Sequence, residues 1–262
     1  MGSYRSELFK FAFFPKFDDA IEYLANKLAD PEEWDFSDAT VKKNAILKNY
    51  LEFTFRKLNG EKKVCFTRDN KNTAFNTGLV TPNLEEIFAL FEEYQGSESG
   101  NRSPFYFKAF VKKSDNRFLN FFADNIPEAA DFFDKPEQLI FNPKCDLIPD
   151  IDHIISDNKE RFPAHLQQAD AAELRRQLTG AIDEARKRVK TNYKIAVPQY
   201  YGGRIQLLLP LCLTSGSPHP DLALVVHKLN NKTYTARTCL TLKMAYNNAR
   251  LIVKPQSNWL RP

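Results

Sequence analysis

A β-hairpin with a polar tip is predicted at residues 194–213, where the sequence reads KIAVPQYYGGRIQLLLPLCL. Its two apolar arms flank Gly202-Gly203, and a Gly-Gly loop can adopt positive φ at both positions, as a tight hairpin turn requires. Because side chains alternate across a strand, this turn also fixes which residues face each other. On one face the expected pairs are Tyr201 with Arg204, Gln199 with Gln206 and Val197 with Leu208, and on the other they are Tyr200 with Ile205, Pro198 with Leu207 and Ala196 with Leu209.

The polar face of this hairpin carries groups that suit a nucleotide. A phenol can stack on a base, an amide can read the edge of that base, and a guanidinium can hold a phosphate. The alternative interpretation is a solvated hairpin end, because polar residues are common beside turns.

Further candidate ligands come from the last expected helix and from a turn near residue 76. On the helix, residues 242–252, Asn248 is an amide on an apolar stripe, so it either holds neighbouring backbone or faces a ligand. Asn76-Thr77-Gly78 suits a small anion, or is a simple turn before a helix that begins at Pro82. The candidate ligand-binding residues are Gln199, Tyr200, Tyr201, Arg204, Gln206, Asn247, Asn248, Arg250, Lys254, Asn76 and Thr77.

Acid-base chemistry has weaker candidates in an acidic segment, CDLIPDIDHIISDN at residues 145–158. Asp150, Asp152 and His153 are residue types that bind a divalent metal or transfer protons, but their spacing continues into no known metal motif. The alternative is a solvated loop that caps helices. His227, expected opposite Tyr234, is a further weak candidate for a general base, against a structural role in an apolar strand. The sequence assigns no cofactor and no metal site, although a divalent ion is compatible with the acidic segment.

Composition sets the broad class. With 262 residues, 43% hydrophobic and 13% aromatic, the chain can bury a substantial core. No apolar run approaches the roughly 20 residues of a membrane span, and no signal peptide is visible, so we expect a cytoplasmic protein without a membrane partner. The four cysteines lack zinc-site spacing and are expected to be free thiols. No serine-hydrolase elbow, phosphate-binding P-loop or dinucleotide-binding glycine motif is present in the sequence.

Charge is distributed unevenly along the chain. Residues 171–262 carry 15 Lys and Arg against four Asp and Glu, a net charge of +11, which leaves −7 on residues 1–170 of a chain whose total is +4. A polyanionic ligand is therefore expected on the C-terminal side, unless the two parts neutralise each other. We expect one globular domain, or two lobes: an acidic lobe at residues 1–165 and a basic, β-rich lobe at residues 166–262.

The hydrophobic patterns predict an α+β fold, with a mixed or antiparallel sheet built from hairpins, flanking helices and a β-rich last third closed by a helix. Helices are expected at residues 15–29, 38–50, 82–91, 126–133, 165–189 and 242–252. Strands are expected at residues 51–58 and 63–67 around Asn59-Gly60, at 105–112 and 117–122, at the hairpin described above, and at 222–229 and 233–240 around Asn230-Asn231.

Three phrases of the sequence resemble a known family. FNTGL at residues 75–79, PQYYGGRIQLLLPLCL at 198–213 and LTLKMAYNNARLI at 240–252 are similar to an uncharacterised family of bacterial and phage proteins known as a domain of unknown function. The resemblance spans about residues 51–260. Some members of that family are joined to a cold-shock-type nucleic-acid-binding domain, so the resemblance implies a role connected with RNA or nucleotides, without a reaction or a catalytic residue.

Three hypotheses follow. The first is a protein that binds a nucleotide or single-stranded RNA through the Tyr/Gln/Asn/Arg face. The second is a hydrolase or phosphotransferase that acts on nucleotides or RNA ends, which requires the acidic segment to lie beside Arg204 and Asn248. The third is a non-enzymatic protein-interaction module, which requires an exposed aromatic patch from Phe105, Tyr106 or Phe107. Whether the chain is an enzyme, and its oligomeric state, stay open.

Overall fold

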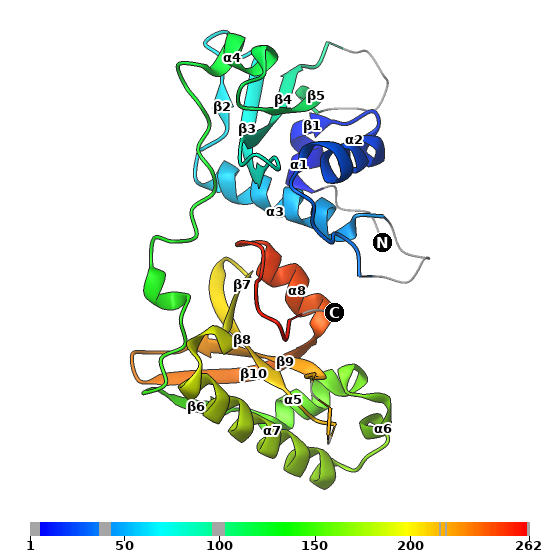
Figure 1. Cartoon of the computed structure of the whole chain (residues 1–262), viewed down its shortest axis with the longest axis vertical. Helices are drawn as coiled ribbons and strands as arrows, with labels where there is room; N and C mark the ends of the chain where they lie inside the picture. The colour runs from blue at the N-terminus through cyan, green and yellow to red at the C-terminus, as the bar shows by residue number, and fades with distance from the viewer. Residues whose placement is uncertain (1–5, 37–42, 96–102, 215, 218, 261–262) are drawn as a thin grey trace. The chain divides into compact units, whose positions relative to one another are not determined.

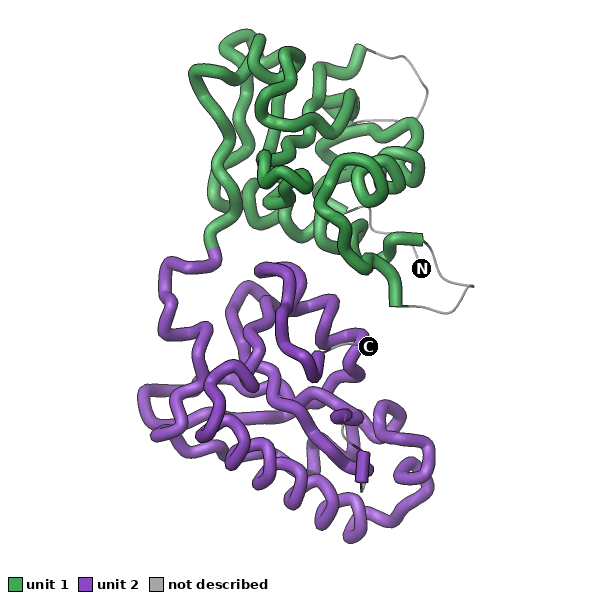
Figure 2. The backbone as a smooth tube through the Cα atoms, in the orientation of Figure 1, with its two compact units in different colours: residues 1–131 green, residues 132–262 purple. Residues whose placement is uncertain are grey.

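A computed structural model describes residues 6–36, 43–95, 103–214, 216–217 and 219–260, and these are the residues discussed below. The chain forms two compact units, Met1–Asp131 and Phe132–Pro262 (Figure 2). Each unit holds one five-stranded mixed sheet with helices packed on it, which confirms the α+β class (Figure 1). The boundary differs from the one expected at residues 165 and 166, because the acidic segment folds into the second unit. Unit 1 carries 18 Lys and Arg against 21 Asp and Glu, and unit 2 carries 19 against 12, so unit 2 is the basic unit.

The sheet of unit 1 has the strand order β1-β5-β4-β3-β2. Its pairs are antiparallel except β1 with β5, which is parallel. The strands are β1 (Ala12–Phe13), β2 (Cys65–Phe66), β3 (Asn72–Val80), β4 (Glu86–Glu93) and β5 (Phe105–Lys112). Its helices are α1 (Glu7–Phe11), α2 (Phe17–Tyr23), which continues as the π-helix η1 (Leu24–Leu28), α3 (Ala45–Gly60) and α4 (Asn116–Phe122).

Several expectations for unit 1 were wrong. Residues 51–58 lie in α3, because Leu47, Leu51, Phe55 and Leu58 form one buried helical stripe. The helix expected from Pro82 is instead strand β4, whose five central residues are all buried. A strand buried on both faces has no alternation, so its spacing imitates that of a helix. Residues 117–122 form helix α4, capped by Asp115, rather than a returning strand, and residues 126–133 form no helix.

The sheet of unit 2 has the order β6-β10-β9-β8-β7, with β6 parallel to β10 and the other pairs antiparallel. Its strands are β6 (Asp146–Pro149), β7 (Val197–Tyr201), β8 (Arg204–Leu211), β9 (Leu222–Lys228) and β10 (Thr233–Thr241). Its helices are α5 (Ile151–Asn158), α6 (Ala164–Gln167), α7 (Ala171–Thr191) and α8 (Leu242–Arg250). Three short 3₁₀ turns of three residues each are η2 (Pro136–Gln138), η3 (Lys159–Arg161) and η4 (Tyr193–Ile195).

Both C-terminal hairpins form, and one has the expected register. Strands β7 and β8 pair as predicted around Gly202-Gly203, with Gln199 opposite Gln206 and Tyr201 opposite Arg204. In the β9–β10 hairpin the register differs by one residue: His227 pairs with Thr235, and Tyr234 pairs with Lys228. The reason is the turn, in which Leu229 N–H donates to the Thr233 carbonyl, so that three residues rather than two form the loop.

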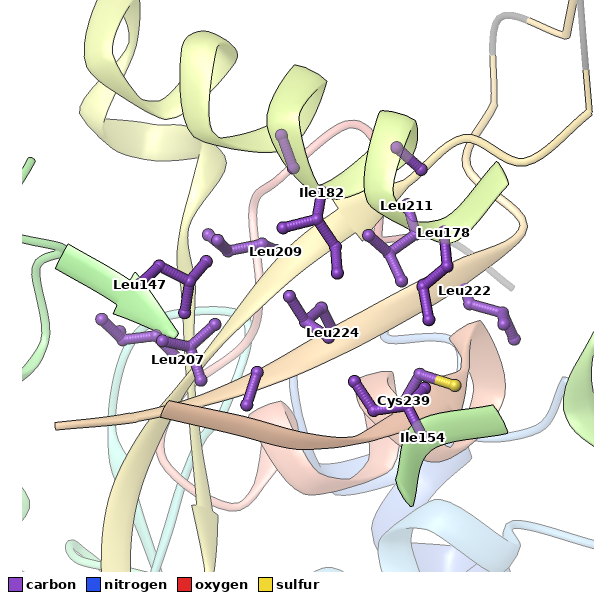
Figure 3. Packing of buried hydrophobic residues seen from close by; sticks show 14 of the residues in the cluster. Leu147, Ile154, Leu178, Ile182, Leu207, Leu209, Leu211, Leu222, Leu224 and Cys239 are labelled. Atoms are coloured by element: carbon purple, nitrogen blue, oxygen red, sulfur yellow. The ribbon is translucent and has the colours of Figure 1, made fainter. Parts of the chain in front are cut away.

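The two faces of this second sheet are covered differently. On one face, α5 and α7 enclose the main core of the unit, formed by alternate residues of β8 and β9, among them Leu207, Leu209, Leu222 and Leu224 (Figure 3). Helix α8 packs on β7, β9 and β10 on the opposite face (Figure 1). Within the described residues, none of the helices has the length and apolar character needed to cross a membrane.

Candidate functional site

Three amide side chains meet on the face of the second sheet that carries α8. Gln199 of β7 donates from Nε2 to Oε1 of Gln206 on β8 at 3.0 Å. Asn248 of α8 donates from Nδ2 to Oε1 of Gln199 at 3.2 Å. Gln199 is only 1% exposed, so its amide is fixed by these two contacts. The hairpin register and α8 together therefore bring three of the predicted site residues into one hydrogen-bonded row.

This row forms part of the wall of a cavity of about 400 Å³, which we call the amide cavity. Tyr201 and Met244 also line it, and their side chains are 60% and 42% exposed. The residues that line the amide cavity are Arg161, Gln199, Tyr201, Arg204, Gln206, Val225, Thr238, Leu240, Met244, Asn247 and Asn248. Its volume lies within the range of small-molecule sites, and its wall combines apolar surface with a few polar groups.

The charged side chains that line the amide cavity are both positive. Arg161 and Arg204 line it, and no carboxylate appears among the described residues of its wall. Arginine is suited to phosphate, because its planar guanidinium donates two parallel hydrogen bonds to an oxyanion. The cavity is therefore suited to a ligand that joins a planar polar group to an anion.

Arg161 was missed by the sequence analysis. Its Nη1 donates to Oδ1 of Asn158 and to the carbonyl oxygen of Cys239, each at 2.7 Å, and lies 3.4 Å from Oγ1 of Thr238. These contacts, with an ion pair between Nε and Glu160 at 3.3 Å, hold the guanidinium at the cavity wall, while Nη2 has no hydrogen-bond partner among the described residues. The side chain is thus fixed on one side and has a donor group left for a ligand.

A β-bulge explains why no sequence pattern revealed this contact. Between Ala236 and Thr238 the pairing of β10 with β9 shifts by one residue, so Arg237 is the inserted position. Ala236 and Cys239 consequently both face the main core, and Thr238 turns to the α8 face, where it meets Arg161. A strict alternation of side chains would have placed Thr238 in the core.

A second cavity adjoins the first where β8 and β9 separate. The ladder between them ends at the pair Leu207 and Val226, and beyond it each strand follows its own hairpin partner. The cavity at this fork, which we call the fork cavity, has a volume of about 440 Å³. It is lined by Lys135, Glu137, Gln138, Arg204, Ile205, Gln206, Leu207, Val226, His227, Lys228, Asn230, Asn231 and Tyr234.

Arg204 and His227 make a contact across the fork. Arg204 Nη1 lies 3.2 Å from His227 Nε2. Burial lowers the pKa of His227, and the neighbouring Arg204 lowers the pKa further. The other ring nitrogen, Nδ1, is buried with no hydrogen-bond partner in the described part of the chain. His227 is therefore a neutral acceptor for Arg204 near neutral pH, and it does not face Tyr234 as the sequence register suggested.

Comparison with known protein families gives one match. The family described as "Domain of unknown function (DUF3825)" matches residues 25–259, most of the chain. The chain belongs to this family. No curated protein matches this DUF3825 chain, and no solved structure matches it. The family description carries no activity, so the site geometry has to support any function.

The catalytic candidates of the acidic segment, Asp150, Asp152 and His153, do not line the amide cavity. Asp150 caps α5, where its Oδ1 accepts from the backbone of His153 at 3.2 Å, and Asp152 pairs with Arg175 of α7 at 2.5 Å. His153 pairs with Asp157, one turn further along α5. None of these residues lines either cavity. In the part of the chain that the structure describes, no three His, Cys, Asp or Glu side chains are grouped as metal ligands. The placement that the enzyme hypothesis required is therefore not found.

Some predicted ligand-binding residues also lie outside the amide cavity. Tyr200 points to the other face of the hairpin and packs on Phe132, with the ring centroids 5.2 Å apart. Arg250 is 5% exposed, and neither Arg250 nor the exposed Lys254 lines the cavity. Asn76 and Thr77 belong to unit 1, where both are buried. They donate to Glu86 and to the Ile87 carbonyl respectively, so they hold β3 to β4.

The aromatic residues named for the protein-interaction hypothesis do not form an exposed patch. Phe107 is buried against Phe14, with stacked rings 4.7 Å apart, and Phe105 packs on Phe11 at 4.9 Å. Tyr106 stacks on Tyr94 at 6.0 Å. These rings belong to the packing of unit 1, so they give that hypothesis no support.

Proposed function

We propose that this DUF3825 chain binds a nucleotide, either free or as a unit of single-stranded RNA, in the amide cavity of unit 2. The observation that carries the proposal is the convergence of Gln199, Gln206 and Asn248 beside Arg161 and Arg204 in one cavity of about 400 Å³. Amides, phenol and guanidinium together match the edge, the face and the phosphate of a nucleotide.

The amide row supports a base as the planar part of the ligand. Gln206 and Asn248 lie at the two ends of the row, and each keeps amide atoms that Gln199 does not use: Nε2 of Gln206 and Oδ1 of Asn248. The edge of a base presents both donors and acceptors, so this amide donor and this amide acceptor can each hydrogen-bond to a base in the cavity. Tyr201, exposed at the rim, offers its ring for stacking.

The two arginines support phosphate as the anionic part. AMP, GMP, CMP and UMP all carry the same phosphate group on the ribose, so this contribution is independent of base identity. Because Arg161 is held by Asn158 and Cys239, less side-chain entropy is lost when it binds an anion. We therefore expect binding that weakens as salt concentration rises.

The test is a titration of the full chain with AMP, GMP, CMP and UMP at low and at physiological salt. The variants are Tyr201→Ala and Asn248→Leu, and the matched control is Tyr193→Ala, since Tyr193 is 64% exposed on η4 of the same unit and outside both cavities. We expect Tyr201→Ala to weaken binding about tenfold, the loss of one base–ring stack of about 1–3 kcal/mol. The proposal fails if none of the four nucleotides binds at low salt, or if Tyr193→Ala weakens binding as much as Tyr201→Ala.

A further inference from the structure

We infer that the ligand of this site is a strand of at least two nucleotides, with one nucleotide in the amide cavity and its neighbour in the fork cavity. The inference rests on the proposed function, and it adds that single-stranded nucleic acid rather than a free mononucleotide is the preferred ligand. It starts from the observation that Arg204 and Gln206 line both cavities. The walls of the two cavities therefore share these two side chains.

The fork exists because two hairpins separate. Beyond Leu207 and Val226 the β8–β9 ladder ends, while the β7–β8 and β9–β10 ladders continue to Arg204 and to Lys228. The space left between the two strands is comparable in volume to the amide cavity, about 440 Å³ against about 400 Å³. A unit of the size that fits the first cavity thus also fits the second.

The fork cavity, like the amide cavity, combines cationic side chains with amide side chains. Its charged lining consists of the cations Lys135, Arg204 and Lys228, with Glu137 as the acid among the described residues, besides His227, which is neutral as argued above. Its amide side chains are Gln138, Gln206, Asn230 and Asn231. Excess positive charge beside neutral hydrogen-bonding groups is the pattern of a groove that follows a nucleic-acid backbone.

Arg204 lies where it can bind the phosphodiester that links the two nucleotides. It belongs to both cavity walls, and its contact with His227 at 3.2 Å across the fork orients the guanidinium. A phosphodiester that joins two nucleotides lies between their sugars, so one guanidinium at the junction can bind it while each base enters its own cavity. A mononucleotide would leave the fork cavity and its lysines unused.

The experiment compares ligands of increasing length on the full chain: AMP, the dinucleotide ApA and single-stranded hexaadenylate RNA. The double variant Lys135→Ala/Lys228→Ala tests the fork cavity. Its control is the double variant Lys187→Ala/Lys190→Ala. The control also removes two positive charges, but from the surface of α7 outside both cavities, and so corrects for general electrostatic attraction.

We expect the wild type and the control to bind ApA about tenfold more tightly than AMP at the same salt concentration. The Lys135→Ala/Lys228→Ala variant should lose that difference and still bind AMP like the wild type. If AMP binds and ApA and the hexamer bind no more tightly, the inference is overturned and the proposed function stands. It is also overturned if ApA binds more tightly but both double variants behave alike. If neither AMP nor the RNAs bind the wild type, the proposed function fails and the inference fails with it.

Discussion

Arg204 and His227 are joined side chain to side chain across the gap at which β8 and β9 separate, with Arg204 Nη1 3.2 Å from His227 Nε2. A guanidinium only donates hydrogen bonds, so Nε2 has to be the acceptor and the proton of the neutral ring lies on Nδ1. Protonation of His227 would place two cations in contact. The protonation state of His227 therefore decides whether this contact can form, and Arg204, which makes it, lines both cavities.

The first prediction concerns the pH dependence of stability. The pKa of His227 is lowered in the folded chain, mainly by burial, so the unfolded chain binds this proton more readily. The corresponding stability is fully present above the ordinary histidine pKa of about 6.5 and is lost as pH falls through that value toward the lowered pKa. Urea unfolding at pH 7.5, 6.5 and 5.5 should show a smaller loss of stability in His227→Gln than in the wild type.

The exposed His165 provides the control for that measurement. His165→Gln should keep the pH dependence of the wild type. An equal loss of stability with falling pH in wild type and His227→Gln would show that the contact with Arg204 does not depend on a neutral His227.

The second prediction concerns Gln199. Gln199→Met keeps the approximate volume but removes the acceptor for Asn248 and the donor for Gln206, which leaves polar atoms of both residues without partners. We expect the free energy of unfolding to fall by about 1–3 kcal/mol, the usual net contribution of two hydrogen bonds. Chemical denaturation provides the measurement, and Gln177→Met on the exposed face of α7 is the control, expected within about 0.5 kcal/mol of the wild type. A Gln199→Met variant as stable as the control would contradict the amide row.

The third prediction compares two glycines with positive φ. Gly78 has φ +71°, and an added Cβ would lie 2.5 Å from the Tyr50 hydroxyl, which donates to the Thr77 carbonyl at 2.9 Å. Gly202 has φ +59° and no atom within 4 Å of an added Cβ. Gly202→Ala should therefore cost only the left-handed backbone, about 1–2 kcal/mol, whereas Gly78→Ala should cost that and the Tyr50 hydrogen bond, about 2–4 kcal/mol in total.

The double variant Tyr50→Phe/Gly78→Ala isolates the steric part of that cost. It removes the hydroxyl that the new methyl group would meet, so it should be more stable than the sum of the two single changes predicts. Unfolding free energies that simply add would show that Gly78 is not in contact with Tyr50.

The fourth prediction concerns thiol reactivity. Burial raises the pKa of Cys239 to about 12, and Cys145 is also buried, whereas Cys65 and Cys212 are half-buried. Because the thiolate is the reactive form, iodoacetamide at pH 8 should leave Cys239 unmodified in the native chain and modify it in urea. Mass spectrometry of digested samples measures each site. Modification of Cys239 before Cys65 and Cys212 under native conditions would contradict its burial.

The site could be predicted from the sequence where local geometry determined it. The Gly-Gly turn fixes the β7–β8 register through the alternation of side chains, and so places Gln199 opposite Gln206. The helical stripe of α8 brings Asn248 to the same face. Arg161 could not be found in this way, because its place depends on a bulge at Arg237 and on contacts to residues 77 and 78 positions further along the chain.

The errors in unit 1 have a related cause. Strand β4 is central in its sheet and buried on both faces, so the sequence lacks the alternation that marks a strand. The segment of α3 from Leu51 to Leu58 satisfies both a two-residue and a four-residue spacing, and only the packing of the whole helix decides between them. The local sequence pattern therefore predicted the β7–β8 and β9–β10 hairpins better than β4 and α3, which are enclosed by the core.

The amide cavity is tested most directly by electron density from crystals of the full chain soaked with a mixture of AMP, GMP, CMP and UMP. The account predicts a base in the amide cavity, with its edge against Gln206 and Asn248, its face on Tyr201 and its phosphate at Arg204 or Arg161. A nucleotide bound elsewhere on the chain, with the amide cavity empty, would contradict it.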